Sequence, residues 1–239
     1  MTPEIFSLIF DPNDVIELRF LGCTAPRQTN AGWFKLSDIS PALLRQIAHL
    51  AEQSEGAYWL PQVITDTARI CRSPKLSFGA VRRRNKQCWP CVSEDRDVSA
   101  RRYLIVDIDP IRPAGCCATD IEKNGAGDLA AAVVRDTESL GWPRPLIVDS
   151  GNGFHLYYRV NPQPGGPVDE ALSDDIAFTL AVLKSRHTKH FDGIAEIDTR
   201  VYNSSRLMKI PGTWAKKGVN TTERPYRQSK ILEVPDGWK

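Results

Sequence analysis

Several features that would assign this 239-residue sequence to a class at once are missing or scarce. No apolar run approaches the roughly 20 residues that a membrane-spanning helix needs. The N-terminal stretch MTPEIFSLIFDPND lacks the basic start and the small-residue cleavage site of a secretory signal. The formal net charge is only +2, so a nucleic-acid partner would depend on local charge clusters. We therefore expect a cytoplasmic protein with no membrane partner.

Cysteine is too sparse, and too irregularly spaced, to indicate a disulfide framework. A chain of this length, with 41% hydrophobic residues, can bury a core without cross-links. The pair Cys88 and Cys91 in CWPC could supply half of a zinc site, with Cys71 as a third ligand. A structural zinc site needs four ligands, and no fourth Cys or His stands nearby. Bound zinc is therefore the less favoured interpretation.

Hydrophobic periodicity predicts strands and a helix in the N-terminal part. DVIELRFLG (14–22) and AYWLPQV (57–63) are expected strands, and SPALLRQIAHLAEQSEG (40–56) is an expected helix with Ser40 as its N-cap. Residues 71–102 are polar, have little periodicity and are expected to form a long loop or insertion.

The second half predicts the order β-α-β-β-α-β, in which helices cover one face of an antiparallel sheet. Strands are expected over 103–109, 145–149, 154–160, 195–198 and 206–212, and helices over about 127–140 and 168–186. The predicted fold class is α+β. We expect a single domain over 1–239, made of an N-terminal αβ module (1–70), the insertion (71–102) and a C-terminal module (103–239).

Two carboxylates end the apolar run RYLIVDIDP. On a strand, Asp107 and Asp109 share one face, while Leu104, Val106 and Ile108 share the face toward the helices. Two like charges at the end of a buried strand favour a bound cation, and oxygen ligands suit Mg²⁺ or Mn²⁺. A D-x-D motif is short and common, so a polar strand end is the alternative.

The segment VDSGNGFHLYYRV predicts a tight turn followed by a returning strand. Gly151 and Gly153 can adopt positive φ and could expose N–H groups to phosphate oxygens. On the strand, His155, Tyr157 and Arg159 share the polar face. A hairpin whose polar face meets solvent is the competing interpretation.

A third acid, Asp198, is predicted at the end of a later strand, and cations follow it in the chain. Acids that hold metal ions and cations that hold a triphosphate are what phosphoryl transfer needs. Arg206 and Lys209 lie three residues apart, which is one face of a helix but opposite faces of a strand. A charged surface hairpin would equally explain Lys216 and Lys217.

Taken in order, VDIDP, DSGNGFHLYYR and IDTRVYNSSRLMKIPGT resemble the three motifs of the archaeo-eukaryotic primase superfamily, especially the primase-polymerase domains of phages, plasmids and other mobile elements. The resemblance runs from about residue 57 to the end of the sequence. It implies an RRM-like catalytic module joined to an N-terminal αβ module. The stretch before DIDP departs from the pattern, because it is longer and richer in cysteine than is usual in such relatives.

The resemblance also implies residue roles. Asp107, Asp109 and Asp198 match the acids that are catalytic and bind two Mg²⁺ or Mn²⁺ ions. His155 matches a histidine that contacts the phosphates of the incoming nucleotide. The other implied nucleotide-binding residues are Ser150, Gly151, Gly153, Arg206 and Lys209. Asn203 matches by sequence, with no independent role.

The expected function is template-directed nucleotidyl transfer, as a DNA primase, a DNA polymerase or both. The expected partners are single-stranded DNA, a primer strand and NTPs or dNTPs, with a helicase as a further candidate partner. Nucleic-acid backbone contacts are expected from Arg82, Arg83, Arg84, Lys86, Lys216 and Lys217. For the run at 82–86 taken alone, a solvated loop is the favoured alternative. Two alternatives are a catalytically inactive replication protein that binds single-stranded DNA and a metal-dependent nuclease or phosphodiesterase.

Overall fold

The computed structural model describes residues 3–23, 29–65, 79–80, 82–84, 87–89, 92–163 and 170–238. The chain divides into two compact units, each with its own core. Unit 1 comprises Met1–Arg102, Pro162–Val168 and Ser204–Trp214, and unit 2 comprises Tyr103–Asn161, Asp169–Asn203 and Ala215–Lys239. None of the described helices is long and apolar enough to cross a membrane.

Unit 1 is built around strand β1 (Val15–Leu21), which has antiparallel partners on both edges. Its partners are β2 (Thr29–Lys35), β3 (Gly56–Trp59) and β4 (Val63–Ile64). Strand β5 (Gly79–Ala80) extends the sheet beyond β2, and β12 (Met208–Lys209) extends it beyond β3. A core of Val15, Ala31, Trp33, Leu60, Ile64 and Val98 lies on this sheet.

The helices of unit 1 are α1 (Pro3–Ser7), α2 (Pro41–Gln53) and the short 3₁₀ helices η1 (Leu36–Asp38) and η2 (Asp95–Asp97). The prediction for α2 is confirmed at its start, because the Ser40 hydroxyl accepts a hydrogen bond of 3.1 Å from the N–H of Leu43. The helix buries Leu43, Ile47 and Ala51 along one stripe.

The predicted insertion contains more regular structure than expected. Besides β5, it has β6 (Arg82–Arg84) and β7 (Gln87–Trp89), which pair antiparallel. The backbones of Arg82, Arg83 and Arg84 therefore form a strand, and Cys88 lies opposite Arg83. Lys86 and the two other candidate zinc ligands, Cys71 and Cys91, lie outside the described residues.

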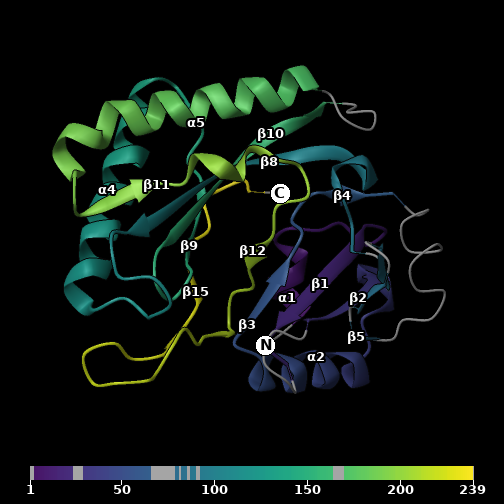
Figure 1. The fold of residues 1–239 in the computed structure, drawn as a ribbon. Helices are drawn as coiled ribbons and strands as arrows, with labels where there is room; N and C mark the ends of the chain where they lie inside the picture. Colours follow the sequence, from purple (N-terminus) through teal and green to yellow (C-terminus); the bar gives the residue numbers. More distant parts are fainter. Residues whose placement is uncertain are drawn as a thin grey trace. The chain divides into compact units, whose positions relative to one another are not determined.

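Unit 2 contains the predicted β-α-β-β-α-β order, which is confirmed (Figure 1). The elements are β8 (Val98–Pro110), α4 (Asp120–Ser139), β9 (Leu146–Asp149), β10 (Phe154–Gln163), α5 (Glu170–Phe191) and β11 (Ala195–Ile197). The strand order is β11-β8-β10-β9, and β15 (Lys230–Glu233) is added at the edge beside β9. Short elements complete the unit: η3 (Thr199–Tyr202), and β13 (Trp214–Ala215) paired with β14 (Arg227–Gln228).

Helices α4 and α5 cover one face of this sheet. Leu104, Val106 and Ile108 of β8 lie in the core with Leu156 and Tyr158 of β10, as predicted from their alternation. Helix α4 begins at Asp120, earlier than the predicted residue 127, because Thr119 and Glu122 form a capping box there. Strand β8 also begins earlier than predicted, at Val98.

Candidate active site

Three aspartates come together at one end of the unit 2 sheet. Asp107 and Asp109 alternate with core residues at the end of β8, so their side chains lie on the face away from the helices. Asp198 directly follows β11, and its N–H donates a 2.8 Å hydrogen bond to the Asp107 carbonyl. Antiparallel pairing also places Glu196 opposite Asp109. Residues far apart in the sequence thus form one acidic cluster.

Asp109 shows that this cluster is electrostatically crowded. Burial is the largest cause that raises the pKa of Asp109 above its ordinary value, and the charges of Asp198 and Glu196 act in the same direction. Arg112 and Lys217 oppose the shift. The ionised carboxylate is therefore disfavoured until more positive charge arrives.

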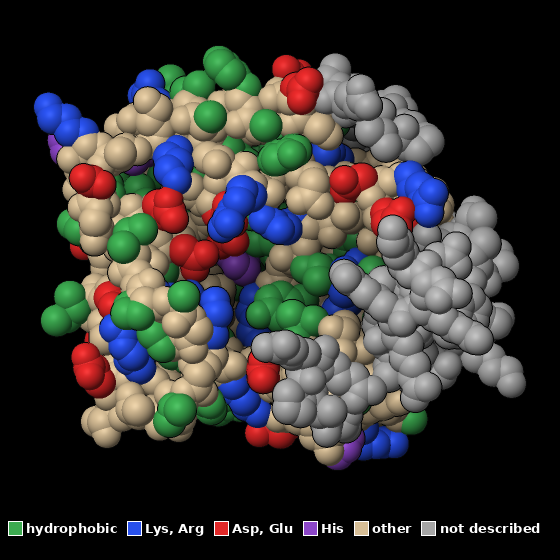
Figure 2. Space-filling view, in the orientation of Figure 1, with side chains coloured by type: hydrophobic (Ala, Val, Ile, Leu, Met, Phe, Trp, Pro, Cys, Tyr) green, Lys and Arg blue, Asp and Glu red, His purple; other side chains and the backbone are tan. Residues whose placement is uncertain are grey.

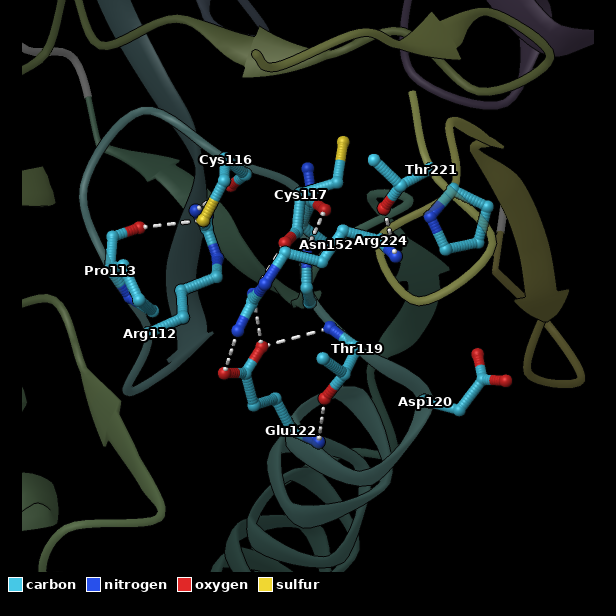
Figure 3. A network of polar contacts seen from close by, with 12 residues as sticks. Arg112, Pro113, Cys116, Cys117, Thr119, Asp120, Glu122, Asn152, Thr221 and Arg224 are labelled. Carbon is cyan, nitrogen blue, oxygen red and sulfur yellow. Dashed lines mark hydrogen bonds and ion pairs between the residues drawn. The ribbon is translucent and has the colours of Figure 1, made fainter. Parts of the chain in front are cut away.

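Arg112 is a fixed positive charge beside the cluster, and the sequence alone did not single it out. Its side chain is only 9% exposed, and one terminal nitrogen lies 3.7 Å from Asp109 Oδ1. The other terminal nitrogen donates a 2.6 Å hydrogen bond to the Cys116 carbonyl, as drawn in Figure 3. Its position three residues after Asp109, in DPIRPAG, was the one available signal.

The loop after β8 is held by arginines at three consecutive carbonyls. Arg112 contacts the Cys116 carbonyl, Arg224 donates to that of Cys117 at 2.7 Å, and Arg227 to that of Ala118 at 2.6 Å. Arg224 is itself fixed by a two-pronged pair with Glu122, at 2.8 Å for each bond (Figure 3). These contacts hold the loop that carries Arg112 against the start of α4.

His155 lies beside the acids on the same face of the sheet. Its Nε2 is 3.5 Å from Asp107 Oδ1, and its side chain is 7% exposed. A row of aromatic contacts supports it, from Tyr157 to Tyr103 and from Tyr103 to the stacked Trp238. Tyr157 is fully buried and its ring contacts that of His155, so it helps to fix the position of His155. Figure 2 shows acidic side chains gathered next to a histidine, with basic side chains beside them.

The backbone N–H groups of Gly151 and Gly153 are not exposed in the way that the sequence indicated. The Gly151 N–H donates to Asp149 Oδ1 at 2.7 Å, and the Gly153 N–H donates to the Ser150 hydroxyl at 3.0 Å. The expectation that these two N–H groups are exposed to phosphates is therefore wrong, because the turn satisfies them itself.

Backbone conformation at Gly151 and close packing at Gly153 explain why glycine occupies these two positions. Gly151 has φ +95°, and a Cβ at Gly153 would lie 2.1 Å from the Ile108 carbonyl oxygen. Glycine therefore lets the turn approach the strand that carries the acids. Any direct role of Ser150, Gly151 and Gly153 in nucleotide binding stays a prediction.

The predicted cations fall in different places. Lys217 is exposed and lies close enough to lower the pKa of Asp109. Its segment packs closely on the loop after β8, because a Cβ at Gly218 would meet the Gly115 carbonyl at 2.4 Å. Lys216 is half-buried.

Arg206 and Lys209 belong to unit 1, whereas the acids belong to unit 2. Lys209 lies on β12, and Arg206 lies outside any helix or strand. Lys209 is buried, its ammonium donates to the Trp214 carbonyl at 2.5 Å, and it lies 5.2 Å from the Tyr58 ring centroid. These contacts account for its buried charge within unit 1.

The donor chemistry of the acidic cluster fits a hard divalent cation, because three carboxylates lie on adjacent strand ends and one of them is poorly stabilised when ionised. Within the described part of the chain, however, no three Asp, Glu, His or Cys side chains are already placed to hold an ion. Asp198 Oδ1 instead accepts from both the N–H and Nε of Arg200, each at 2.9 Å.

No protein-family model and no curated protein sequence matches the chain. Its fold resembles a crystal structure of primase RepB′, with 12% identity over 98% of this chain and 57% of that one and a TM-score of 0.48. The chain thus spans little more than half of that RepB′ chain.

Two further solved structures align over most of their own lengths. The catalytic domain of primase RepB′ in complex with initiator DNA has 10% identity over 97% of this chain and 84% of that one, with a TM-score of 0.46. The polymerase domain of Mycobacterium tuberculosis Ligase D in complex with DNA has 12% identity over 94% of this chain and 76% of that one, with a TM-score of 0.49. Because all three TM-scores lie below 0.5, the proposal that follows depends on this chain's own residues. These three structures are of a primase, of the catalytic domain of that primase and of a polymerase domain.

Proposed function

We propose that the chain is a metal-dependent nucleotidyltransferase that adds NTPs or dNTPs to a nucleic-acid 3′ end on a single-stranded DNA template. The observation that carries the proposal is the acidic cluster of Asp107, Asp109 and Asp198 at adjacent strand ends beside His155. In the reaction a 3′-hydroxyl attacks the α-phosphorus of a nucleotide, and pyrophosphate leaves.

The three aspartates would hold two Mg²⁺ or Mn²⁺ ions, which when bound lower the pKa of the attacking hydroxyl and neutralise the charge of the leaving pyrophosphate. His155, held by its aromatic row 3.5 Å from Asp107, is positioned to donate a hydrogen bond to a phosphate oxygen. Lys217 is exposed and close to Asp109, so it would contact the triphosphate.

Arg112 would act differently from Lys217. It is buried and anchored to the Cys116 carbonyl, so it holds Asp109 in place rather than reaching toward a ligand. The motif resemblance further implies a setting in the replication of a phage, plasmid or other mobile element, with a helicase as partner. That setting and that partner are part of the proposal.

The test is incorporation of labelled NTPs or dNTPs on primed and unprimed single-stranded DNA, with Mg²⁺ and with Mn²⁺ in turn. Asp107→Asn should abolish incorporation, while Asp128→Asn, an exposed acid on α4, should leave it unchanged. Equal circular dichroism and melting curves would show that both variants are folded.

Three results would overturn the proposal. Wild-type protein that binds the template but incorporates nothing with either metal would be an inactive DNA-binding protein. Release of nucleotides from the DNA with no extension would show a nuclease. Full activity of Asp107→Asn would remove the acidic cluster from the chemistry.

A further inference from the structure

The carboxylate of Asp198 is already engaged by a cation from its own chain. Oδ1 accepts from the N–H and the Nε of Arg200 at 2.9 Å each, and Oδ2 accepts from a terminal nitrogen of Arg200 at 3.4 Å. The guanidinium therefore meets both oxygens, which is the two-pronged geometry that arginine favours with carboxylates. The oxygens of Asp198 are turned toward Arg200 as a result.

The two members of this pair differ in how firmly they are fixed. Asp198 has a side chain only 14% exposed, caps η3 and is tied to β8 through its N–H. Arg200 is 83% exposed, so its side chain can leave at little cost in packing. The arginine is the movable partner.

Arg200 also faces the rest of the acidic cluster. Asp198 is its main partner, and Glu196 and Asp109 act on it at longer range through their charges. Arg112 is buried and bonded to the Cys116 carbonyl, and Lys217 acts on Asp109 through its charge. Among these cations, Arg200 is the one that both contacts an acid of the cluster directly at two oxygens and remains exposed.

From this arrangement we propose that Arg200 is a removable counter-ion, which occupies the Asp198 carboxylate until a divalent cation displaces it. The inference rests on the proposed function, since it concerns the same acids. It accounts for the finding that the described side chains do not form a ready three-ligand site, because one of the three carboxylates is turned to the arginine. Arg200 then sets the ion concentration at which the cluster fills.

The expected signature is an increase in metal affinity on removal of a positive charge. Arg200→Gln should bind Mn²⁺ about 2- to 5-fold more tightly than wild type, the range that an exposed ion pair can contribute. Arg200→Lys, which keeps the charge but not the two-pronged contact, should fall between the two. The gain should shrink as salt is added, because an exposed pair is screened.

Mn²⁺ binding to the purified full chain can be followed by electron paramagnetic resonance, without any nucleotide or template. The matched control is Arg186→Gln, because Arg186 is another exposed arginine that makes a two-pronged pair, with Asp136. That variant should bind Mn²⁺ like wild type. Asp198→Asn should weaken binding and so show that the signal reports this cluster.

A second readout is the melting temperature. Without metal, Arg200→Gln should melt lower than wild type, because the repulsion among the acids is then less relieved. The same high Mn²⁺ concentration should raise its melting temperature by more than it raises that of wild type, since an ion that binds only the folded state stabilises it by an amount that grows with the logarithm of its affinity. Arg186→Gln should show the wild-type Mn²⁺ increment.

The outcomes separate this inference from the proposed function. If wild type binds Mn²⁺ through Asp198 but Arg200→Gln binds it equally or more weakly, the counter-ion role is wrong and the nucleotidyltransferase proposal stands. If wild type shows no Mn²⁺ binding at any accessible concentration, both fail.

Discussion

Two acids, Glu17 in unit 1 and Asp109 in unit 2, lie in very different surroundings. In unit 1, Glu17 is fully buried and accepts hydrogen bonds from Trp33 Nε1 at 2.8 Å and from the Ser93 N–H at 2.9 Å. Arg19 pairs with it and also donates to the Ser93 carbonyl. All three of these neighbours of the carboxylate are donors, and together they connect β1, β2 and residue 93.

In unit 2, Asp109 is less buried than Glu17, but its charge is less well compensated. Burial raises its pKa, and although Arg112 and Lys217 oppose the shift, the charges of Asp198 and Glu196 add to it. Glu17 is the more buried acid, whereas Asp109 is the one whose ionised form is disfavoured, so depth of burial alone does not show how well a carboxylate charge is stabilised. Whether the neighbours are donors or other acids does.

The largest expected effect is that of a substitution at Asp109. Asp109→Asn should reduce the rate of incorporation about 10³-fold, which corresponds to about 4 kcal/mol of activation free energy, because it removes one of the proposed metal ligands. The same change should leave the metal-free protein as stable as wild type or more stable at neutral pH, since it removes a disfavoured charge. Single-turnover incorporation and urea unfolding would measure the two effects. A destabilised, still active variant would contradict the assignment.

The converse is expected at Glu17. Glu17→Gln should lower the free energy of unfolding by about 2–4 kcal/mol, because it leaves buried donors and Arg19 without their carboxylate. Once corrected for the folded fraction, incorporation per molecule should match wild type. The exposed acid Glu223 provides a control, and Glu223→Gln should change neither quantity. Loss of activity without loss of stability in Glu17→Gln would contradict the purely structural role of Glu17.

The pH dependence of stability sharpens the contrast. Because the pKa of Asp109 is raised in the folded state, the folded protein holds its proton longer than the unfolded chain does. The free energy of unfolding should therefore fall as pH rises from about 4, the ordinary pKa, through the raised value. Unfolding curves in chelator should show this fall in wild type and a smaller one in Asp109→Asn. Identical pH profiles for the two proteins would contradict the shift.

The smallest expected effect concerns Lys217. Lys217→Gln should raise the KM for the nucleotide about 2- to 5-fold with little change in kcat, because an exposed cation contributes modestly to anion binding. Lys216→Gln should have a weaker effect, since Lys217 is exposed and acts on Asp109, whereas Lys216 is half-buried. Steady-state kinetics at two salt concentrations would test this, and an equal effect of both variants would contradict the placement.

The sequence predicted the local elements better than their extent. Alternation along β8 and β10 identified the core face and the acidic face correctly, because a strand buried on one side must alternate. The strand β2, in contrast, was not predicted, although TNAGWFK forms seven paired positions with β1. Because of its glycine and its mixed polarity, TNAGWFK lacks the alternating pattern that predicts a strand. Pairing with β1 stabilises it instead.

The parts of the site that sequence could not supply are the ones that depend on tertiary contact. The resemblance of three motifs named the acids and His155 before any geometry was known. It did not name Arg112, whose role comes from burial against the Cys116 carbonyl, or Arg200, which looks like any surface arginine in DTRVY. The expectation of exposed N–H groups in the turn came from its two glycines and was wrong, because nothing in SGNG shows that Asp149 and Ser150 already accept them.

The close approach of Gly153 to the strand has a consequence for how such sequences are recognised. Since the Ile108 carbonyl oxygen occupies the space that a side chain at 153 would need, glycine is demanded there by the architecture, with or without chemistry. The glycine at 153 therefore reflects the close approach of the turn to β8. A variant without any of the three aspartates would still need glycine there, so this glycine reports the shape of the turn and not the presence of an activity.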